Sequence, residues 1–313
     1  MVILELAEIR RRLVDTAILD CMREALLACS RGECDTPMPM HLGIAAEEAE
    51  VHIKSSYRRG GKYFVLKMAS TFPGNLARGV PVGNGMMLLG SAATGEPVAL
   101  LADGGHLTDV RTAAVAAMVA RELGRRDTVL GIVGSGIQAR LQARFHAGVL
   151  PLRQIWIWGR TAERAAQCRS EIAAELPGIE VRLAASPAEV GRAARLIVTA
   201  TAARAPLLHA DDIQAGTFIA AVGADSVGKQ ELDAEILRRA ALVLVDSRRQ
   251  CEKLGELQHA SDQWGRAVEI GEYCAAPVVV AADAITVADF TGLGVEDLYI
   301  AERCWESGGW EAE

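Results

Sequence analysis

The sequence predicts an α/β protein in which a Rossmann-type, doubly wound parallel sheet is joined to a second, α+β domain. Residues 128–149 read as a strand, a glycine turn and a helix. After this segment strand and helix patterns alternate, and before it most of the predicted elements are strands. The 313 residues suffice for two domains with separate cores. We expect one domain at 1–125, completed by 286–313, and the parallel-sheet domain at 126–285.

The glycine turn organises the second domain. A β-branched run at 128–133 leads into Gly134-x-Gly136-x-x-Ala139 and then into a helical pattern. In this pattern Gly134 makes the turn, Gly136 lets backbone N–H groups approach a pyrophosphate, and Ala139 allows close helix packing. A purely structural glycine turn is the alternative. The residues that we expect at a dinucleotide are Gly134, Gly136, Ile137, Gln138 and Ala139.

Residues 1–125 show a helix followed by strands. We expect a helix at 4–31, possibly broken near Asp15, then a loop at 32–40. Short apolar runs separated by Gly, Pro and Asn predict strands at 49–53, 63–68, 85–89 and 98–102. Thr108 is a candidate N-cap for a helix at 109–123.

From residue 128 onward, strand and helix patterns alternate. Strands are predicted at 128–133, 154–158, 179–183, 195–199, 217–222, 241–246 and 278–282, and helices at 137–149, 161–175, 187–193 and 231–239. A last helix, from 294 or 295 to 305, has no strand after it. We therefore expect the C-terminal segment to pack on the first domain.

Composition excludes several classes of function. The net charge is −7 and no Lys/Arg block exceeds three residues, which argues against nucleic-acid and anionic-membrane partners. There is no apolar run of about 18 residues and no signal-peptide pattern. Seven cysteines without C-x-x-C pairs predict reduced thiols in a cytoplasmic protein. The six histidines form no evident ligand cluster, so no metal is expected.

The residues after the second predicted strand of the parallel sheet, at 154–158, indicate whether the cofactor is NAD(H) or NADP(H). An acidic residue there would bind a ribose 2′-hydroxyl, but this chain has Arg160 and a capping Thr161. That pair suits a 2′-phosphate, which favours NADP(H) and leaves NAD(H) possible. The alternative is a helix-capping turn with an exposed arginine.

Three further segments carry a family resemblance. They are YFVLKMASTFPGN at 63–75, LTDVRTAA at 107–114 and AVGADSVGKQEL at 221–232. With Gln138 after the glycine turn, and with Asp246-Ser247, Gly255-Glu256-Leu257, Thr291-Gly292 and Glu296-Asp297, the chain resembles the ornithine cyclodeaminase/mu-crystallin family from about residue 60 to 300.

The resemblance implies hydride exchange between nicotinamide and the α-carbon of a small amino or cyclic imino acid. The activity would be ornithine cyclodeamination or reduction of a ketimine such as pyrroline- or piperideine-2-carboxylate. It also implies a homodimer through the N-terminal domains, which would bind substrate, and NAD(P) on the inserted domain. The alternative is an NADP-binding protein with weak turnover.

The resemblance also assigns roles to residues. Lys67 and Arg111 would clamp the substrate carboxylate, and Asp225 would be the acid/base at the substrate nitrogen. Lys229 would neutralise Asp225 or contact substrate. Cofactor contacts would come from Thr199, Thr201, Thr291 and Gly292.

Two of these assignments have structural alternatives, and one family feature is missing. Lys67 could instead pair with Asp109 or another acid, and Asp225 could simply form a turn. The family's Pro-x-Arg arginine has no counterpart in TPMPMHL at 36–42. Either His41 substitutes weakly for that arginine, or the substrate is not ornithine.

Overall fold

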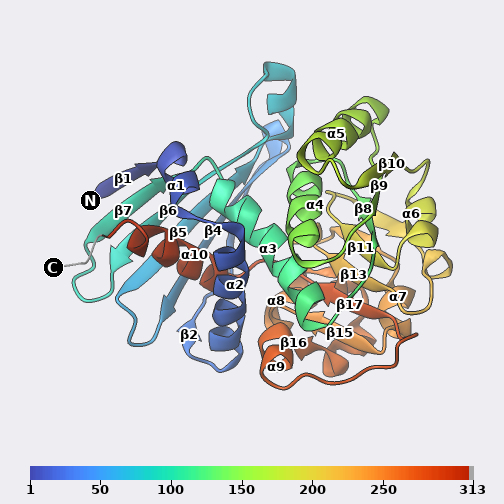
Figure 1. The fold of residues 1–313 in the computed structure, drawn as a ribbon. Coiled ribbons are helices and arrows are strands. Elements are labelled where there is room, and N and C mark those ends of the chain that lie inside the picture. Colours follow the sequence, from blue (N-terminus) through green and yellow to red (C-terminus); the bar gives the residue numbers. More distant parts are fainter. Residues whose placement is uncertain (310–313) are drawn as a thin grey trace. The chain divides into compact units, whose positions relative to one another are not determined.

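The computed structural model describes residues 1–309, which divide into two compact units (Figure 1). The first unit is Met1–Arg111 together with the chain from Leu293 onward, and the second is Thr112–Gly292. The division therefore lies within helix α3 (His106–Glu122) and after Gly292. The predicted boundaries, at 125/126 and 285/286, differ from these positions. The second boundary lies after residue 285 because a strand at 286–289, described below, belongs to the second unit.

The first unit is built on a seven-stranded sheet of order β1-β7-β6-β5-β4-β2, with β3 also paired to β4. Only the β1–β7 pair is parallel. The strands are β1 (Val2–Glu5), β2 (Cys34–Asp35), β3 (Met40–Ile44), β4 (Ala49–Arg58), β5 (Tyr63–Thr71), β6 (Gly83–Ser91) and β7 (Pro97–Ala102). The four predicted strands are confirmed, while β1, β2 and β3 were not predicted.

The two faces of this sheet differ. On one face Lys54, Lys67 and Met87 lie directly opposite one another on successive strands and are buried. Helix α10 (Gly294–Glu306) packs against β4, β5, β6 and helix α2 (Asp15–Ser30). On the other face, neighbouring positions such as Leu66 and Met86 are 41% and 39% exposed. The sheet is thus covered on one side within this unit.

The predicted N-terminal helix is two helices, α1 (Leu6–Arg12) and α2, with the break just before Asp15 as expected. Helix α3 begins before Thr108, so Thr108 is not its N-cap. The carboxylate of Asp103 instead accepts the N–H groups of Gly105 and Leu107, at 3.2 and 2.6 Å. An acid three residues before a helix satisfies orphan donors as a capping threonine would.

The second unit contains an eight-stranded parallel sheet of order β10-β9-β8-β11-β13-β17-β15-β16. Its strands are β8 (Val129–Val133), β9 (Gln154–Trp158), β10 (Glu180–Leu183), β11 (Leu196–Thr199), β13 (Phe218–Ala221), β15 (Leu242–Val245), β16 (Val268–Glu269) and β17 (Thr286–Asp289). The chain order reverses between β8 and β11, as in a doubly wound fold. A small pair, β12 (Arg204–Leu208) and β14 (Gln230–Leu232), lies outside this sheet.

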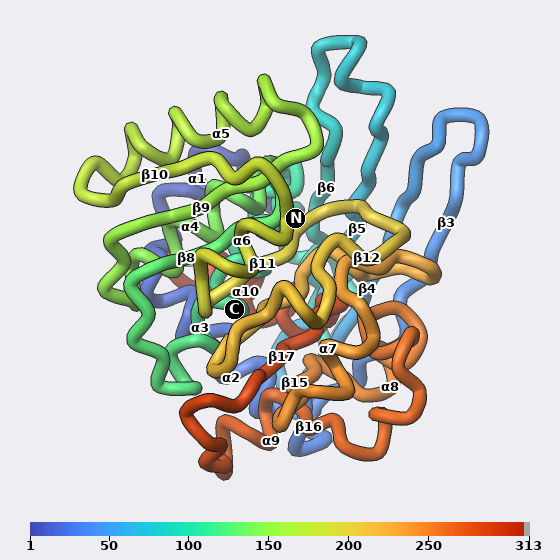
Figure 2. The backbone as a smooth tube through the Cα atoms, turned by 90° about the vertical axis from the view of Figure 1, so that its right-hand side faces the viewer, coloured from blue at the N-terminus to red at the C-terminus, as the bar shows by residue number. Residues whose placement is uncertain are grey.

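Strand β17 corrects the sequence prediction. The apolar run at 278–282 is not a strand, and Val279 is fully exposed. The strand is Thr286–Asp289, buried between β13 and β15, where its trace is easily followed in Figure 2. A short apolar run looks the same to pattern analysis whether it is a buried strand or a surface segment. Because β17 belongs to this sheet, the second unit extends past residue 285.

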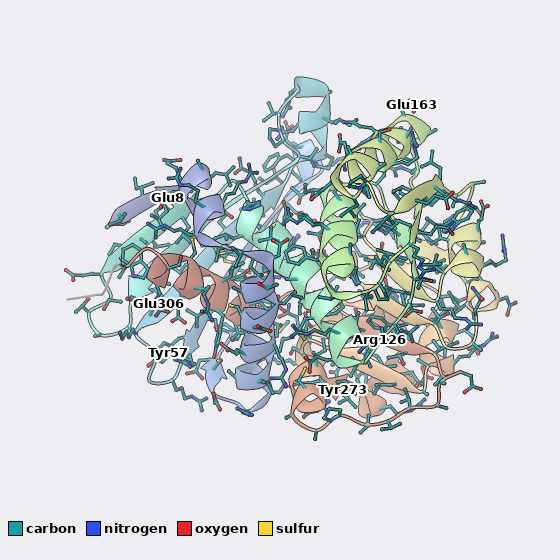
Figure 3. The ribbon with its side chains drawn as sticks, in the orientation of Figure 1. Glu8, Tyr57, Arg126, Glu163, Tyr273 and Glu306 are labelled. Atoms are coloured by element: carbon teal, nitrogen blue, oxygen red, sulfur yellow. The ribbon has the colours of Figure 1, made fainter. Side chains whose placement is uncertain are left out.

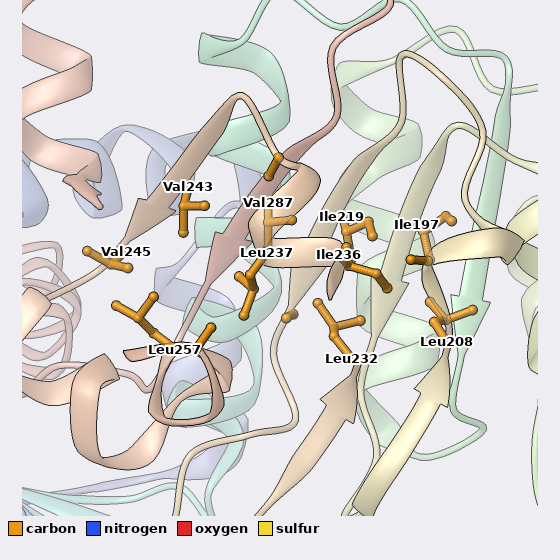
Figure 4. Packing of buried hydrophobic residues seen from close by; sticks show 14 of the residues in the cluster. Ile197, Leu208, Ile219, Leu232, Ile236, Leu237, Val243, Val245, Leu257 and Val287 are labelled. Carbon is orange, nitrogen blue, oxygen red and sulfur yellow. The ribbon is translucent and has the colours of Figure 1, made fainter. Parts of the chain in front are cut away.

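Helices flank the parallel sheet. They are α4 (Ile137–Val149), α5 (Ala162–Glu175), α6 (Pro187–Ala193), α7 (Ala234–Arg239), α8 (Arg248–Leu254) and α9 (Ile270–Ala275). Helices α4 and α5 lie side by side (Figure 1). Buried residues of α6 and α7 pack on inward residues of β11, β13, β15 and β17, such as Ile219 and Val287 (Figure 4). This core holds the carboxyl ends of the strands in fixed positions.

Candidate functional site

The turn after β8 accepts only glycine at its first position. Gly134 has φ of 137°, in the left-handed region, and its N–H donates to Trp158 O at 2.8 Å. A Cβ on Gly134 would lie 2.6 Å from Ala200 O. Ala139, in the first turn of α4, is fully buried. The tight turn and the close helix packing expected from the sequence are both present.

The second glycine leaves space at the start of α4. A Cβ on Gly136 would meet no atom within 4 Å, and the next residue, Ile137, is 54% exposed. The Arg140 guanidinium donates hydrogen bonds to Ser135 O and Gly136 O at 3.2 and 2.8 Å, so these two carbonyl groups of the turn already have a donor. The first N–H groups of the helix then face the open side. This arrangement fits a dinucleotide pyrophosphate.

The end of β9 meets the glycine turn. A Cβ on Gly159 would lie 2.4 Å from Ser135 Oγ, so glycine is needed for this approach. Arg160 and Thr161 follow and are exposed. Thr161 occupies the N-cap position of α5, but its hydroxyl makes no capping hydrogen bond there, contrary to expectation. Glu163 provides the acidic side chain of the first turn (Figure 3).

Two threonines, one at the end of β11 and one in the loop that follows, bind a buried acid. Thr199 Oγ1 donates to Glu231 Oε2 at 2.7 Å, and Thr201 donates to Glu231 Oε1 through its N–H and hydroxyl at 2.6 and 2.7 Å. Gly223 N also donates to Oε2, and a Cβ there would lie 2.5 Å from this oxygen. Burial raises the pKa of Glu231 to about 7, against the hydrogen bonds from the threonines. Glu231 therefore joins the loops after β11 and β13.

Two more buried acids, Glu256 and Asp289, also accept hydrogen bonds from backbone N–H groups of the loops. Glu256 accepts the N–H groups of Glu231 and Leu232 at 2.7 and 3.1 Å. Asp289 accepts those of Glu256 and Leu257 at 2.9 and 3.0 Å. Burial raises the pKa of Asp289 to about 7 and that of Glu256 well above its ordinary value. The loops at the carboxyl ends of the strands are thus linked through carboxylates to backbone N–H groups.

Thr291 and Gly292 are fixed in the same way. Asp246 Oδ2 accepts both of their N–H groups at 2.7 Å, and Asp246 Oδ1 accepts the Thr291 hydroxyl at 3.0 Å. Gln250 Nε2 donates to Gly292 O at 2.8 Å. The backbone after β17 therefore has a defined conformation.

Asp225 lies in the loop after β13. Its carboxylate accepts Lys229 Nζ at 2.6 Å and the Ser226 hydroxyl at 3.0 Å. The Asp225 side chain is 40% exposed and that of Lys229 is 11% exposed. The structure thus brings the predicted acid/base and the predicted neutralising lysine together, with the carboxylate open to solvent.

In the first unit, Lys67 and Arg111 converge on one acid. Lys67 Nζ and Arg111 Nε lie 3.2 and 3.3 Å from Asp297 Oδ1, and all three side chains are buried. Burial lowers the pKa of Lys67, while Asp297 opposes that shift. Burial alone would raise the pKa of Asp297, but Lys67 and Arg111 hold it below its ordinary value. The alternative named for Lys67, an ion pair with Asp109 or another acid, is thus present, and the acid is Asp297 of α10.

Sequence reasoning missed the roles of Glu296 and Lys54. Arg111 Nη1 donates to Glu296 Oε2 at 2.8 Å, and Lys54 lies directly across the strands from Lys67. Glu296-Asp297 stands among apolar residues at the start of a helix, so charged residues at core positions were the available signal there. Lys54 shares its strand face with the polar residues His52 and Ser56, so the sequence pattern gave no signal that Lys54 is buried.

Two of the six histidines lie close together and beside an acid, so the expectation that the histidines form no ligand cluster stays a prediction. Among the described residues, His41, Glu50 and His52 offer three ligand atoms within 4.8 Å of one another. Within residues 1–309, no helix is long and apolar enough to cross a membrane.

Comparisons with known proteins agree with this geometry. A putative dehydrogenase of Rhizobium meliloti is 37% identical over 310 residues, covering 96% of this chain and 94% of that protein. The Δ1-pyrroline-2-carboxylate reductase of Bacillus cereus is 30% identical, with 87% and 85% covered. An archaeal alanine dehydrogenase dimer with bound NAD superposes with a TM-score of 0.89 at 28% identity, covering 98% and 96%.

The doubly wound sheet, its glycine turn and these relatives define an NAD(P)-dependent oxidoreductase. The model of the ornithine cyclodeaminase/mu-crystallin family matches residues 1–308. The chain belongs to that family.

Proposed function

We propose that this protein is a ketimine reductase, which reduces a cyclic imino acid such as pyrroline- or piperideine-2-carboxylate, with ornithine cyclodeamination as the related reaction. The observation that carries this proposal is the convergence of Lys67 and Arg111 on the carboxylate of Asp297, with Lys67 Nζ 2.9 Å from Oδ2 and Arg111 Nε 3.3 Å from Oδ1. Two buried cations that lie against one carboxylate group are placed to bind the carboxylate of a substrate as well. Lysine supplies a point charge and arginine a directional fork.

Asp225 is the proposed acid/base. Lys229 Nζ stands 2.6 Å from its carboxylate and orients it, and the Asp225 side chain is 40% exposed. When bound, the nicotinamide supplies or accepts the hydride. Asp225 then gives a proton to, or takes one from, the nitrogen of the substrate.

The proposed cofactor is NADP(H), held by the turn at Gly134 and Gly136. Arg160 supports the phosphate form because it is an exposed cation directly after β9, where the adenosine ribose is read. Thr161 offers a hydroxyl in the same place. The related alanine dehydrogenase binds NAD, so NADH is the comparison cofactor in every assay.

A homodimer is the proposed assembly. Apolar side chains gather on the uncovered face of the first unit's sheet; among them Met40 and Leu42 are 57% and 55% exposed, and Leu66 and Met86 about two fifths. Contiguous exposed apolar surface of this kind marks a protein interface. A dimeric relative supports pairing with a second copy.

Purified protein offered pyrroline-2-carboxylate or piperideine-2-carboxylate should oxidise NADPH faster than NADH. Asp225→Asn should abolish this reaction without changing NADPH binding, and the exposed Asp262→Asn is the matched control. Ammonia release from ornithine with NAD, without imine reduction, would make the protein a cyclodeaminase instead. Absence of turnover with all of these substrates would contradict the proposed substrate class.

A further inference from the structure

The β3–β4 hairpin of the first unit brings together a set of side chains that the hydride-transfer chemistry does not use. His41 on β3 lies directly opposite His52 on β4, and Glu50 is two residues from His52 on the same face of β4. In an antiparallel pair, opposite side chains and their i+2 neighbours on one face are within reach of each other. We propose that His41, Glu50 and His52 bind a divalent first-row transition cation such as Zn²⁺.

The distances match a ligand set better than a hydrogen-bonded group. The Nε2 atoms of His41 and His52 lie 3.4 and 3.5 Å from Glu50 Oε2. Hydrogen bonds of this type are ordinarily about 2.7–3.2 Å. Two ligands bound to zinc at about 2.0–2.2 Å with tetrahedral angles lie about 3.4 Å apart. The two pairs that include Glu50 are thus already spaced as ligands of one cation, and all three ligand atoms lie within 4.8 Å of one another.

The second observation is the environment of His52. Its side chain is 14% exposed, and its Nε2 atom is enclosed with no hydrogen-bond partner within the described part of the chain. An enclosed ring nitrogen without a hydrogen bond costs free energy unless something binds it. The imidazole rings of His41 and His52 are 4.9 Å apart between centroids and inclined at 64°. A cation bound by both rings and Glu50 would give the enclosed His52 Nε2 a partner.

The ligand types indicate the metal class. Two imidazoles and one carboxylate suit zinc, nickel, copper or iron(II) rather than magnesium or calcium, which prefer oxygen ligands. The His41 side chain is 50% exposed, so a fourth position can hold water. No redox step is required of the metal.

The location suggests what the metal does. Strand β3 pairs only with β4, and its outward residues Met40 and Leu42 belong to the exposed apolar face. A slip of one residue in this pairing would send His41 to that face and Met40 or Leu42 to the other. A cation that joins His41 to His52 fixes the register of this edge strand.

The test is metal binding by the tag-free, chelator-treated full-length protein. Calorimetric titration with Zn²⁺ should give one site per chain, and its affinity should fall at least about 100-fold in H41A, E50Q and H52A, because even outer-shell partners contribute 10–100-fold. H209A is the matched control: His209 is an exposed histidine beside one carboxylate, Asp233, at 3.4 Å. The H209A variant should bind zinc with the same affinity and stoichiometry as the unsubstituted protein.

Two further readouts separate this site from other causes. Co²⁺ should give d–d bands without the thiolate charge-transfer band that binding to any of the seven cysteines would produce. Zn²⁺ should raise the thermal unfolding midpoint of the unsubstituted protein and H209A, but not of H41A, whose exposed position makes the substitution compatible with folding. Absence of stoichiometric binding, unchanged affinity in H41A and H52A, or a thiolate cobalt spectrum would each overturn the proposal. Binding is measured without substrate or cofactor, so its failure is distinct from failure of the proposed function.

Discussion

The two units neutralise their buried charges in different ways. In the first unit, Asp297 is paired with the cations of Lys67 and Arg111. In the second, Glu231 and Asp289 are stabilised by backbone N–H groups and hydroxyls. The pKa of Asp297 is accordingly lowered, whereas burial raises the pKa of Glu231 and Asp289 to about 7.

This difference has a physical reason. Pairing with an acid allows lysine and arginine to stay charged where they are buried, and the proposed site for an anionic substrate needs charged cations. Hydrogen bonds from loop N–H groups instead fix the conformation of those loops, as a cofactor cradle requires. Buried charge is therefore compensated by opposite charge in the first unit and by backbone N–H groups and hydroxyls in the second; the substrate-binding role of the first cluster is the proposal made above.

The largest expected effect is at Asp297. Asp297→Asn removes the charge that compensates Lys67 and Arg111, and breaking a buried pair in this way costs about 3–5 kcal/mol. Urea unfolding would measure the loss. The control Asp262→Asn removes an exposed partner of Arg238 and should leave the unfolding curve nearly unchanged. Equal curves for both variants would show that Asp297 is not compensating buried cations.

Lys67→Met tests the cation side of the same cluster. Loss of a charge-assisted bond to substrate should lower kcat/KM by roughly 10- to 100-fold while NADPH binding stays unchanged. Steady-state kinetics and cofactor titration would separate the two. Lys62→Met, at an exposed position five residues earlier, is the control. Unaltered kcat/KM in the Lys67 variant would contradict the proposed carboxylate clamp.

Glu231→Gln tests the positioning role in the second unit. Each carboxylate oxygen accepts one backbone N–H, from Thr201 or Gly223, so an amide NH₂ must face a donor. We expect a loss of about 1–3 kcal/mol in unfolding free energy, with weaker cofactor binding. The exposed Glu235→Gln serves as control. A variant as stable as its control would mean that these hydrogen bonds do not fix the loops.

The two units should also differ in their response to pH. Folding binds protons at Glu231 and Asp289, so their contribution to stability is complete below the ordinary pKa values of 4.5 and 3.8 and is lost as pH rises to about 7. Asp297, with its lowered pKa, contributes above pH 3.8 and loses that contribution as pH falls further. When the free energy of unfolding is measured as the pH rises to 7, it should fall less in the Glu231→Gln variant than in the unsubstituted protein.

Arg160→Ala is expected to have the smallest effect. At an exposed position the lost contact to a 2′-phosphate should raise the KM for NADPH about tenfold and leave that for NADH unchanged. The control is Arg164→Ala, also exposed, one turn further along the chain. Equal changes for both cofactors would remove the basis for preferring NADP(H).

Much of the second unit could be predicted because its signals are local. The turn at Gly134 and Gly136 depends on residues adjacent in sequence, and helix α4 has the bounds expected for it. Strand β17 was missed because nothing local distinguishes Thr286–Asp289 from the exposed run at 278–282. Its position between β13 and β15 follows from sheet order, which is a nonlocal property.

The sequence by itself determined the fold class and the glycine turn, and its family resemblance pointed to Lys67 and Arg111. The first two follow from periodicity and glycine conformation. Only the tertiary structure decided that Asp297 neutralises both cations, that Glu231 holds Thr199 and Thr201, and that His41 faces His52. Each of these contacts joins segments that the strand register and helix packing bring together, and short-range pattern cannot specify such pairings.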